Sequence, residues 1–165
     1  MTSTTAGPAA DRRLALETHP VRFLFDMHID FHPAPVHATP FGTRIVFAVK
    51  EGRFQGPGLS GTVLPGSADW MTVGSDGVGR VDVRATLRTD DGDHIHMTNT
   101  GRIVLGEHRD RLFAGARVTS DEAYIRTSPL FETGSTRHAD LNTVTTVGLC
   151  DISLNDIYYR IFAIA

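Results

Sequence analysis

Residues 80–87 alternate strictly between polar and apolar side chains. The polar even positions and the apolar odd positions read Arg80, Val81, Asp82, Val83, Arg84, Ala85, Thr86 and Leu87. Successive side chains of a β-strand point to opposite faces, so this segment predicts a strand with one polar and one apolar face. The apolar face has to be covered by other parts of the chain, which predicts a sheet that packs against a partner or closes on itself.

Similar short segments follow one another through the rest of the chain, separated by turn-favouring pairs such as Asp76-Gly77 and Asp91-Gly92. No long window shows the 3.6-residue period of a helix, although 106–115 and 134–141 leave room for a helical turn. The predicted strands cover 23–30, 44–49, 62–64, 70–73, 79–89, 94–98, 103–105, 115–119, 124–126, 142–149 and 157–165. This pattern predicts an all-β fold, a single antiparallel β-barrel of about eight strands with room for one small ligand.

The glycine-dense stretch 52–61 lies between two of these strands. No Gly-Lys-Ser/Thr follows it and no helix opens after it, so it does not match a phosphate-binding loop. We expect these glycines to mark corners, bulges or places where two backbones approach closely.

Charge and composition exclude several classes of function. The 165 residues carry a formal net charge of −3 with eight His counted as neutral, which argues against a nucleic-acid partner. No apolar run approaches the roughly 20 residues of a membrane-spanning helix, and residues 1–20 lack the apolar centre of a secretory signal. We therefore expect a cytoplasmic protein with a disordered tail over 1–19 and one domain over 20–165. Cys150, the single cysteine, is expected to be a buried structural thiol.

The only tryptophan of the chain, Trp70, follows directly after a carboxylate. Desolvation against an indole raises the pKa of a carboxyl group and suits it to acid–base catalysis. Asp69 is therefore a candidate catalytic residue, and Trp70 a candidate substrate-binding residue. An alternative of equal weight is that Asp69 accepts backbone N–H groups of the preceding turn while Trp70 fills the core.

The polar face of residues 80–87 has two interpretations. On the outside of the protein, Asp82 and Arg84 belong to a ladder of ion pairs, and periodicity alone favours this interpretation because exposed charge pairs are common. Inside a barrel, Arg84 would act in catalysis as a clamp for an anion or a carbonyl, and Asp82 would bind substrate.

Tyr124 and Arg126 share one face of a predicted strand, so both are candidate substrate-binding residues that offer a donor and a cation. Glu132, six residues further on, is a candidate catalytic carboxylate. The alternative is an amphipathic strand at the barrel rim in which Glu132 pairs with a surface arginine.

His94 and His96 also share a face, as any i, i+2 pair in a strand does. A metal site would need a third ligand from His28, His32, His37, His108 or His138. Two alternating histidines are weak evidence for zinc, so we expect no metal. Because the chain also lacks a nucleophile elbow, a CxxC pair and a dinucleotide fingerprint, we expect no cofactor.

Several motifs carry a resemblance to a known family. They are Arg53-Phe54-x-Gly56-Pro57-x-Leu59-x-Gly61-x-Val63-x-Pro65-Gly66-x-Ala68-Asp69-Trp70, Asp82-x-Arg84, Leu87-x-Thr89-Asp90-Asp91-Gly92, Tyr124-x-Arg126, Phe131-Glu132-Thr133 and Leu141-Asn142. In order and spacing they resemble the UPF0311 group, also called the DUF3237 domain, from about Phe23 to Ala165. The chain departs from the family at Asp140, where Trp is usual, and near His96, where an aromatic residue is usual.

The resemblance implies a β-barrel of the broad kind found in lipocalin-like and allene-oxide-cyclase-like proteins, with no established activity. It gives more weight to Asp69, Asp82, Arg84 and Arg126 as pocket residues. Its motifs also make His96 and Asn142 candidate substrate-binding residues.

We therefore expect a cofactor-independent enzyme, an isomerase, cyclase or lyase, that acts on a small apolar or aromatic metabolite. Asp69 or Glu132 would transfer the proton, while Arg84, Arg126 and Tyr124 would stabilise an enolate-like intermediate. The alternative is a non-catalytic carrier of a small hydrophobic ligand. In either case the partner is a small molecule, and the sequence leaves assembly into a homo-oligomer open.

Overall fold

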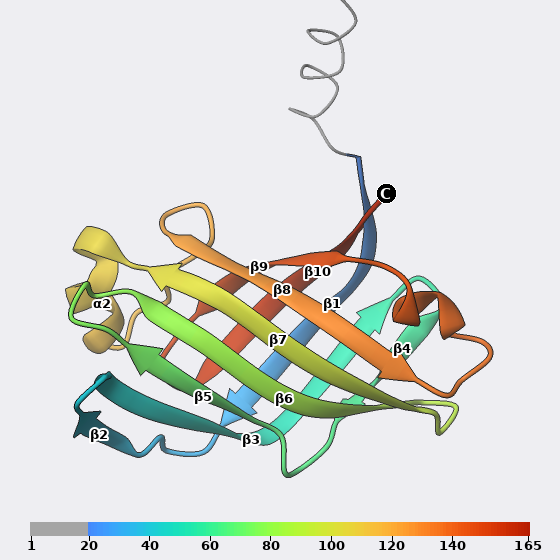
Figure 1. Ribbon diagram of the computed structural model, residues 1–165, viewed down its shortest axis with the longest axis horizontal. Coiled ribbons are helices and arrows are strands. Elements are labelled where there is room, and N and C mark those ends of the chain that lie inside the picture. The colour runs from blue at the N-terminus through green and yellow to red at the C-terminus, as the bar shows by residue number, and fades with distance from the viewer. Residues whose placement is uncertain (1–19) are drawn as a thin grey trace, which may run out of the picture.

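The protein is an antiparallel β-barrel with a few short helical turns (Figure 1). The computed structural model describes residues 20–165, so the predicted tail over 1–19 lies outside the described residues. The strands are β1 (Val21–Phe31), β2 (Val36–Thr39), β3 (Gly42–Gly56), β4 (Leu59–Val63), β5 (Ala68–Val73), β6 (Gly79–Thr89), β7 (His94–Val104), β8 (Tyr124–Thr133), β9 (Thr146–Ile152) and β10 (Asp156–Ile164). The helical turns are η1 (Gly106–His108), α2 (Arg109–Phe113) and η2 (Ala139–Asn142). The predicted all-β barrel is confirmed.

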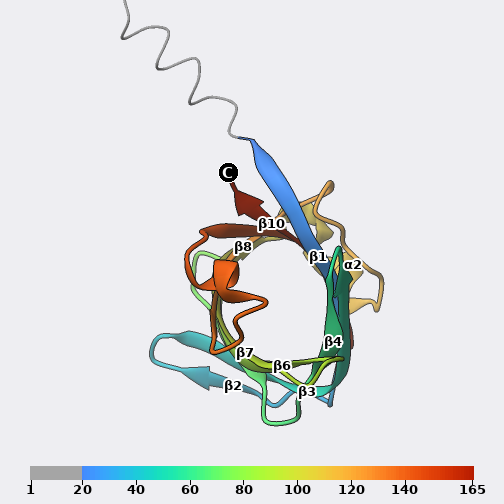
Figure 2. The same cartoon turned by 90° about the vertical axis from the view of Figure 1, so that its right-hand side faces the viewer.

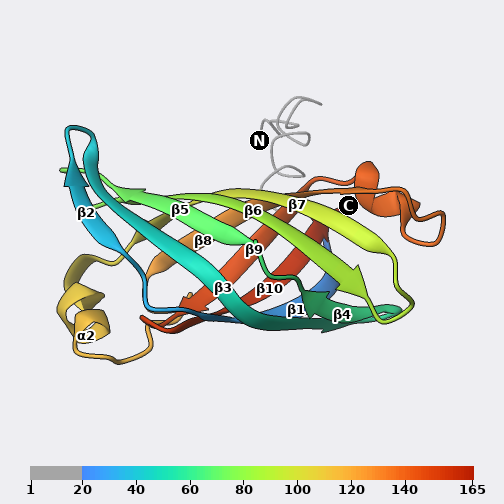
Figure 3. The same cartoon turned by 90° about the horizontal axis from the view of Figure 1, so that it is seen from below.

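The strands close into a ring with eight positions (Figure 2). β1 pairs with β10 on one side and with β3 on the other, and the ring continues from β10 through β9, β8, β7 and β6. β4 and β5 share the position between β6 and β3, with β4 beside residues 53–56 of β3 and β5 beside residues 43–48. β2 pairs with the first residues of β3 and lies at one end of the barrel, the same end as α2 (Figure 3).

The alternation of polar and apolar side chains along β6 shows which face of the sheet points into the barrel. Its odd positions, Val81 to Leu87, are buried, while Arg80, Asp82 and Arg84 are exposed. The inner faces of the strands meet in one core, whose largest fully buried side chains are Phe25, Phe54, Met27, Leu87, Ile95, Met97, Ile125 and Ile161. Eight strands leave an interior that side chains just fill, and burying each large apolar side chain stabilises the fold by about 1.5–3 kcal/mol.

Glycines lie where two backbones come too close for a side chain. A Cβ atom on Gly56 would overlap the carbonyl oxygen of Leu24, and one on Gly61 would overlap the carbonyl oxygen of Arg88. The glycine-dense stretch 52–61 therefore lets β3 and β4 pack tightly on their neighbours, in line with the close backbone approach expected there.

The observed strands differ from the predicted ones in several places. β2 was not predicted, β8 continues past Arg126 to Thr133, and β9 begins at Thr146 rather than at Asn142. β7 runs without a break where two strands were predicted, because its residues from Ile95 to Val104 all pair with β8. β3 continues past Gly52 to Gly56 because its second half pairs with β1 and β4. Residues 115–119 form no strand and contribute only an isolated bridge between Val118 and Ile152. The helices within residues 20–165 are all too short or too polar to cross a membrane.

Candidate functional site

Asp69 lies on the inner face of the barrel wall. It pairs directly with Val83 of β6 and with Phe47 of β3, and the side chains of directly paired residues lie on the same side of a sheet. Val83 is buried, and so is Met71, which shares the face of Asp69 two residues further along β5. Trp70 lies on the opposite face and is 39% exposed, so it does not fill the core.

The ladder between β5 and β6 is interrupted beside Asp69. Pairs form at Asp69–Val83 and again at Thr72–Arg80, but not at the two positions between them. In this gap the backbone N–H of Asp82 donates to Oδ1 of Asp69 at 3.0 Å. The guanidinium of Arg44 donates to the carbonyl oxygen of Trp70. Polar side chains therefore complete the hydrogen bonding of the two strands where the ladder is open.

The carboxyl group of Asp69 has a higher pKa than an ordinary aspartate. Burial is the main cause that raises its pKa from 3.8 to about 6, and the nearby carboxylate of Asp82 adds to the rise. The hydrogen bond from the Asp82 backbone and the charge of Arg44 act in the opposite direction without cancelling the effect of burial. A carboxyl group with a pKa near 6 exchanges protons close to neutral pH, which is the property required of a general acid or base.

Further polar side chains face the interior from the opposite part of the wall. Tyr159 of β10 pairs with Cys150 of β9, and the Cys150 sulfur lies 3.8 Å from Oγ1 of Thr127 on β8. Burial raises the pKa of Cys150 to about 12 and raises that of Tyr159 well above 10, and the negative charge of Asp69 adds to both shifts. Both groups are therefore neutral at physiological pH, and Cys150 is a buried thiol as expected.

Asn99 of β7 completes the polar interior. It is fully buried and pairs with Val83, the residue that also pairs with Asp69. Its carboxamide faces the Tyr159 phenol as a potential hydrogen-bond partner and lowers the pKa of that group against the larger effect of burial. In the structure, however, neither polar atom of the Asn99 side chain forms a hydrogen bond with acceptable distance and angle. The sequence analysis missed Asn99, although the period of β7 places it on the same face as Ile95 and Met97 and could have identified it as a buried amide.

Asp82 and Arg84 lie on the outer face of β6, opposite the buried valines. Their side chains form an ion pair at 2.5 Å, with about half of each side chain exposed. The catalytic interpretation needed both residues inside the barrel, and the structure places them outside because the apolar residues of the same strand turn inward.

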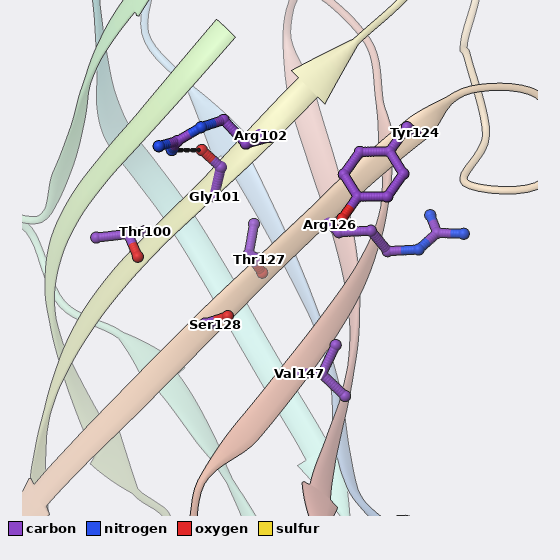
Figure 4. Close-up of a pocket in the computed structure, with 8 residues that line it drawn as sticks. All are labelled: Thr100, Gly101, Arg102, Tyr124, Arg126, Thr127, Ser128 and Val147. Atoms are coloured by element: carbon purple, nitrogen blue, oxygen red, sulfur yellow. Dashed lines mark hydrogen bonds between the residues drawn. The ribbon is translucent and has the colours of Figure 1, made fainter. Parts of the chain in front are cut away.

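Tyr124 and Arg126 also lie on the outer face, in a pocket of about 440 Å³ over β7 and β8 (Figure 4). The Arg126 guanidinium lies 5.5 Å from the centre of the Tyr124 ring, and Tyr124 is 57% exposed. Arg102, directly opposite Arg126 on β7, points away from it. These residues do not share a cavity with Asp69, because the inward side chains of β8 alternate with them.

The remaining predicted site residues are also outside the barrel interior. Glu132 and His96 are paired opposite each other on the exposed face of β8 and β7, and His94 lies on the same face. Asn142 in η2 accepts from the backbone N–H of Thr133 at 2.8 Å and donates to its carbonyl oxygen at 3.0 Å. Asn142 therefore holds η2 against the end of β8.

One group of potential metal ligands occurs among the described residues, on the outer face of β1 and β10. It consists of His28, Asp30 and Asp156, and excludes His94 and His96. The carboxylate oxygen of Asp156 that contacts His28 at 3.1 Å also forms an ion pair with Arg117 at 2.5 Å. A guanidinium already neutralises the most buried of the three groups, so the donor set does not favour a cation there.

The comparison with known families now identifies the chain. The model of a family described as "Protein of unknown function (DUF3237)" matches residues 20–164. The chain belongs to the DUF3237 family. The resemblance read from the motifs is thereby confirmed, and it covers almost all of the described residues.

Individual relatives agree with the family and with the fold. A UPF0311 protein of Clostridium acetobutylicum is 35% identical over 98 residues, which cover 59% of this chain and 62% of the relative. The chain thus matches about three fifths of the length of that relative. A solved structure of a conserved protein of unknown function from Rhodopseudomonas palustris aligns with a TM-score of 0.84 and 23% identity, over 90% of this chain and 99% of the other.

A further barrel of similar fold comes from a protein described as an enzyme. The crystal structure of this enzyme from Penicillium herquei aligns with a TM-score of 0.64 and 24% identity, over 87% of this chain and 94% of the other. At this identity the likeness concerns the fold alone. The same barrel architecture therefore occurs in a protein with catalytic activity and in proteins of unknown function.

Proposed function

We propose that this DUF3237 protein is an acid–base enzyme, an isomerase, cyclase or lyase, in which Asp69 transfers a proton to or from a small, largely apolar metabolite. The observation that carries the proposal is the inward-facing carboxyl group of Asp69, whose pKa is raised to about 6 by burial. Of the three catalytic candidates from the sequence, Asp69 is the one on the inner face. Arg84 and Glu132, on the outer face, have no part in the proposed reaction.

The surroundings of Asp69 suit proton transfer. Above pH 6 the carboxylate is the main form and accepts a proton, and below pH 6 the carboxyl group donates one. The backbone N–H of Asp82 holds Oδ1 in place, so the other oxygen remains for the substrate. Phe47 and Met71 beside Asp69 provide an apolar surface that excludes water from the reacting atoms.

Tyr159 is the second polar group in reach of the reaction. Burial raises its pKa, so it keeps its proton at neutral pH and can donate a hydrogen bond to an oxygen that gains negative charge. The interior then offers a base and a neutral donor, as the removal of a proton beside a carbonyl group requires.

The experiment uses uncharged aromatic ketones as probes, because their α-protons report a general base directly. Deuterium exchange into 1-indanone, 2-tetralone and acetophenone is followed by proton NMR with purified protein in D2O. We expect exchange that increases with pH around a midpoint near 6, and that falls about 10²-fold or more in Asp69→Asn. Asp140→Asn is the matched control, since it makes the same chemical change at an exposed carboxylate that does not act on the pKa of Asp69.

Two results would overturn the proposal. Exchange that is equal in the wild type and in Asp69→Asn removes Asp69 from catalysis. Tight binding of these ketones by both proteins, without exchange in either, would instead support the carrier of a small hydrophobic ligand.

A further inference from the structure

Asn99 is an exception among the buried polar groups of the barrel. Its side chain is fully buried, and neither Nδ2 nor Oδ1 has a hydrogen-bond partner. Roughly nine in ten buried polar groups are paired, and leaving one unpaired costs about 1–3 kcal/mol. Thr146, which is equally buried, donates its hydroxyl to the carbonyl oxygen of Pro129. An unpaired carboxamide in the same interior therefore needs an explanation that packing does not provide.

The position of Asn99 connects it to Asp69. Both residues pair with Val83, so Asp69, Val83 and Asn99 form one row across the inner faces of β5, β6 and β7. Neighbouring strands are about 4.8 Å apart, which puts the two backbones roughly 10 Å apart along the wall. A small molecule that lies across Val83 contacts both side chains at its two ends.

The interior around Asn99 offers no positive charge. Tyr159 and Cys150 keep their protons because burial raises the pKa of each, and Thr127 adds a hydroxyl group. Among residues 20–165, no lysine or arginine side chain is buried in the core. An anionic ligand group at Asn99 would therefore find no countercharge and would face the carboxylate of Asp69, which excludes an anion there.

The side chains that flank this row can move aside. Met71 lies two residues from Asp69 and Met97 two residues from Asn99, each on the same inner face. Methionine side chains are flexible and adapt their packing to an inserted group. The filled interior of the barrel is therefore compatible with a ligand that displaces methionine side chains.

We infer that Asn99 anchors the ligand of the barrel through two hydrogen bonds, to a neutral group that carries an oxygen acceptor beside an O–H or N–H donor. The Nδ2 amide donates to the acceptor, and Oδ1 accepts from the donor. Amides, lactams and hydroxycarbonyl compounds have this arrangement, whereas carboxylates and simple ketones lack the donor. The inference rests on the proposed function for the location of the ligand and adds its chemical class.

The test compares three bicyclic probes of nearly equal size. 2-Naphthamide has an acceptor and a donor, 2-acetylnaphthalene has an acceptor alone, and 2-naphthoate is charged. We expect 2-naphthamide to bind the wild-type protein about tenfold more tightly than 2-acetylnaphthalene, and 2-naphthoate to bind most weakly. In Asn99→Leu the first two should bind alike. Affinities are measured by titration with ligand-observed NMR.

The melting temperature is a second measurement, and it distinguishes the proposed ligand anchor from an asparagine that stabilises the fold. Asn99→Leu keeps the number and branching of the side-chain heavy atoms and removes two unpaired polar atoms, so its melting temperature should rise by a few degrees while the preference for the amide disappears. Thr146→Val is the matched control. It should lower the melting temperature, because the Pro129 carbonyl loses its donor, and it should keep the preference.

A lower melting temperature in Asn99→Leu, or an unchanged preference for 2-naphthamide, would overturn the inference. These results are separable from a failure of the proposed function. If Asp69→Asn retains deuterium exchange while Asn99→Leu loses the preference, Asn99 still anchors the ligand and the acid–base assignment is wrong.

Discussion

Asp69 shows how one residue can serve both the fold and the chemistry. Its carboxylate accepts the Asp82 backbone N–H in the gap of the β5–β6 ladder, which is a structural role. The same burial that places it there raises its pKa to about 6. The structural alternative from the sequence is not observed in the form expected, because the bond comes from Asp82 of the neighbouring strand rather than from the preceding turn and Trp70 is exposed. This hydrogen bond leaves one carboxylate oxygen of Asp69 free.

The raised pKa of Asp69 predicts a dependence of stability on pH. A folded-state pKa of about 6 against 3.8 in the unfolded chain means that the native state binds the proton more tightly. The contribution of Asp69 to stability is therefore complete below about pH 4 and is lost as the pH rises through 6. Asn keeps the acceptor for Asp82 N–H and does not ionise. We expect Asp69→Asn to gain roughly 1–3 kcal/mol over the wild type between pH 4 and 7.

Urea unfolding at pH 4, 5, 6 and 7 measures this gain. Asp140→Asn serves as the control because its carboxylate is exposed, pairs with Arg22 and does not act on the pKa of Asp69. A difference between Asp69→Asn and the wild type that stays constant over this range would contradict the assigned pKa.

Among single residues, the sequence identifies Asp69 as a candidate site residue and does not identify Asn99, for reasons that the structure makes clear. Asp69 lies beside the only tryptophan, which draws attention to it, although Trp70 turned out to face outward. Asn99 lies between Thr98 and Thr100, so the inner and outer faces are hard to separate there by composition. Asp82, Arg84, Tyr124 and Arg126 were grouped by charge and by motif, but their orientation depends on which face of each strand closes inward.

Strand packing on the inner face depends on a small–large–small arrangement across three strands. Thr127 of β8 pairs with Gly101 on one side and with Gly148 on the other. A Cβ atom on Gly148 would lie 2.5 Å from Oγ1 of Thr127 and 3.8 Å from its Cβ. A Cβ atom on Gly101 would lie 2.5 Å from the backbone carbonyl oxygen of Arg126 and 2.7 Å from Cγ2 of Thr127. Gly148 therefore makes room for the Thr127 side chain alone, whereas Gly101 makes room for backbone as well.

This difference predicts a non-additive pair of substitutions. Gly148→Ala should destabilise the protein by about 1–3 kcal/mol, because it overpacks the Thr127 hydroxyl. In the Thr127→Ala background most of this loss should disappear, since the atom in contact is gone. Gly101→Ala meets backbone atoms as well as Cγ2 of Thr127, so Thr127→Ala should rescue only a minor part of its loss. Chemical unfolding of the single and double variants completes the two cycles, and equal rescue of both glycine variants would contradict the prediction.

The elements that could be predicted are those in which side chains alternate clearly, as in β6. The predicted limits 79–89 agree with the strand because Asp90, Asp91 and Gly92 end it in a turn. The sequence predicts two strands in place of β7, because Gly101 interrupts the apolar face of that strand. A glycine is needed at this position because Thr127 lies close to it on the neighbouring strand. Contacts of this kind between strands are not visible in one segment of sequence.

At the scale of the whole molecule, the start of β10 is held in place by contacts with residues that are distant in the sequence. Asp156 contacts His28 of β1 and Arg117 of the segment between α2 and β8, and its neighbour Ser153 also donates to it. Burial alone would raise the pKa of Asp156, but the hydrogen bonds from Ser153, Arg117 and His28 outweigh it and lower the pKa. This cluster connects three parts of the chain where the barrel closes.

Asp156→Asn should therefore destabilise the barrel by about 1–3 kcal/mol at pH 7. Because the folded-state pKa is lowered, this stability is present above the unfolded pKa of about 4 and is lost as the pH falls below it. The deficit of the variant should shrink accordingly in acid. Asp140→Asn, which removes an exposed ion pair with Arg22, should change stability by less than about 0.5 kcal/mol. Thermal unfolding at pH 7 and pH 3 measures both, and equal deficits would contradict the role of Asp156.

The pairing of β1 with β10 also determines how this chain reaches its native state. Each of these pairs, from Val21–Ile164 to Asp30–Asp156, joins residues more than 120 positions apart. The hairpins β6–β7 and β9–β10 join close neighbours and can form early, whereas the closing pair requires most of the chain to be ordered first. We expect refolding kinetics limited by the meeting of β1 with β10, so substitutions in this pair should slow folding more than substitutions in the β6–β7 turn.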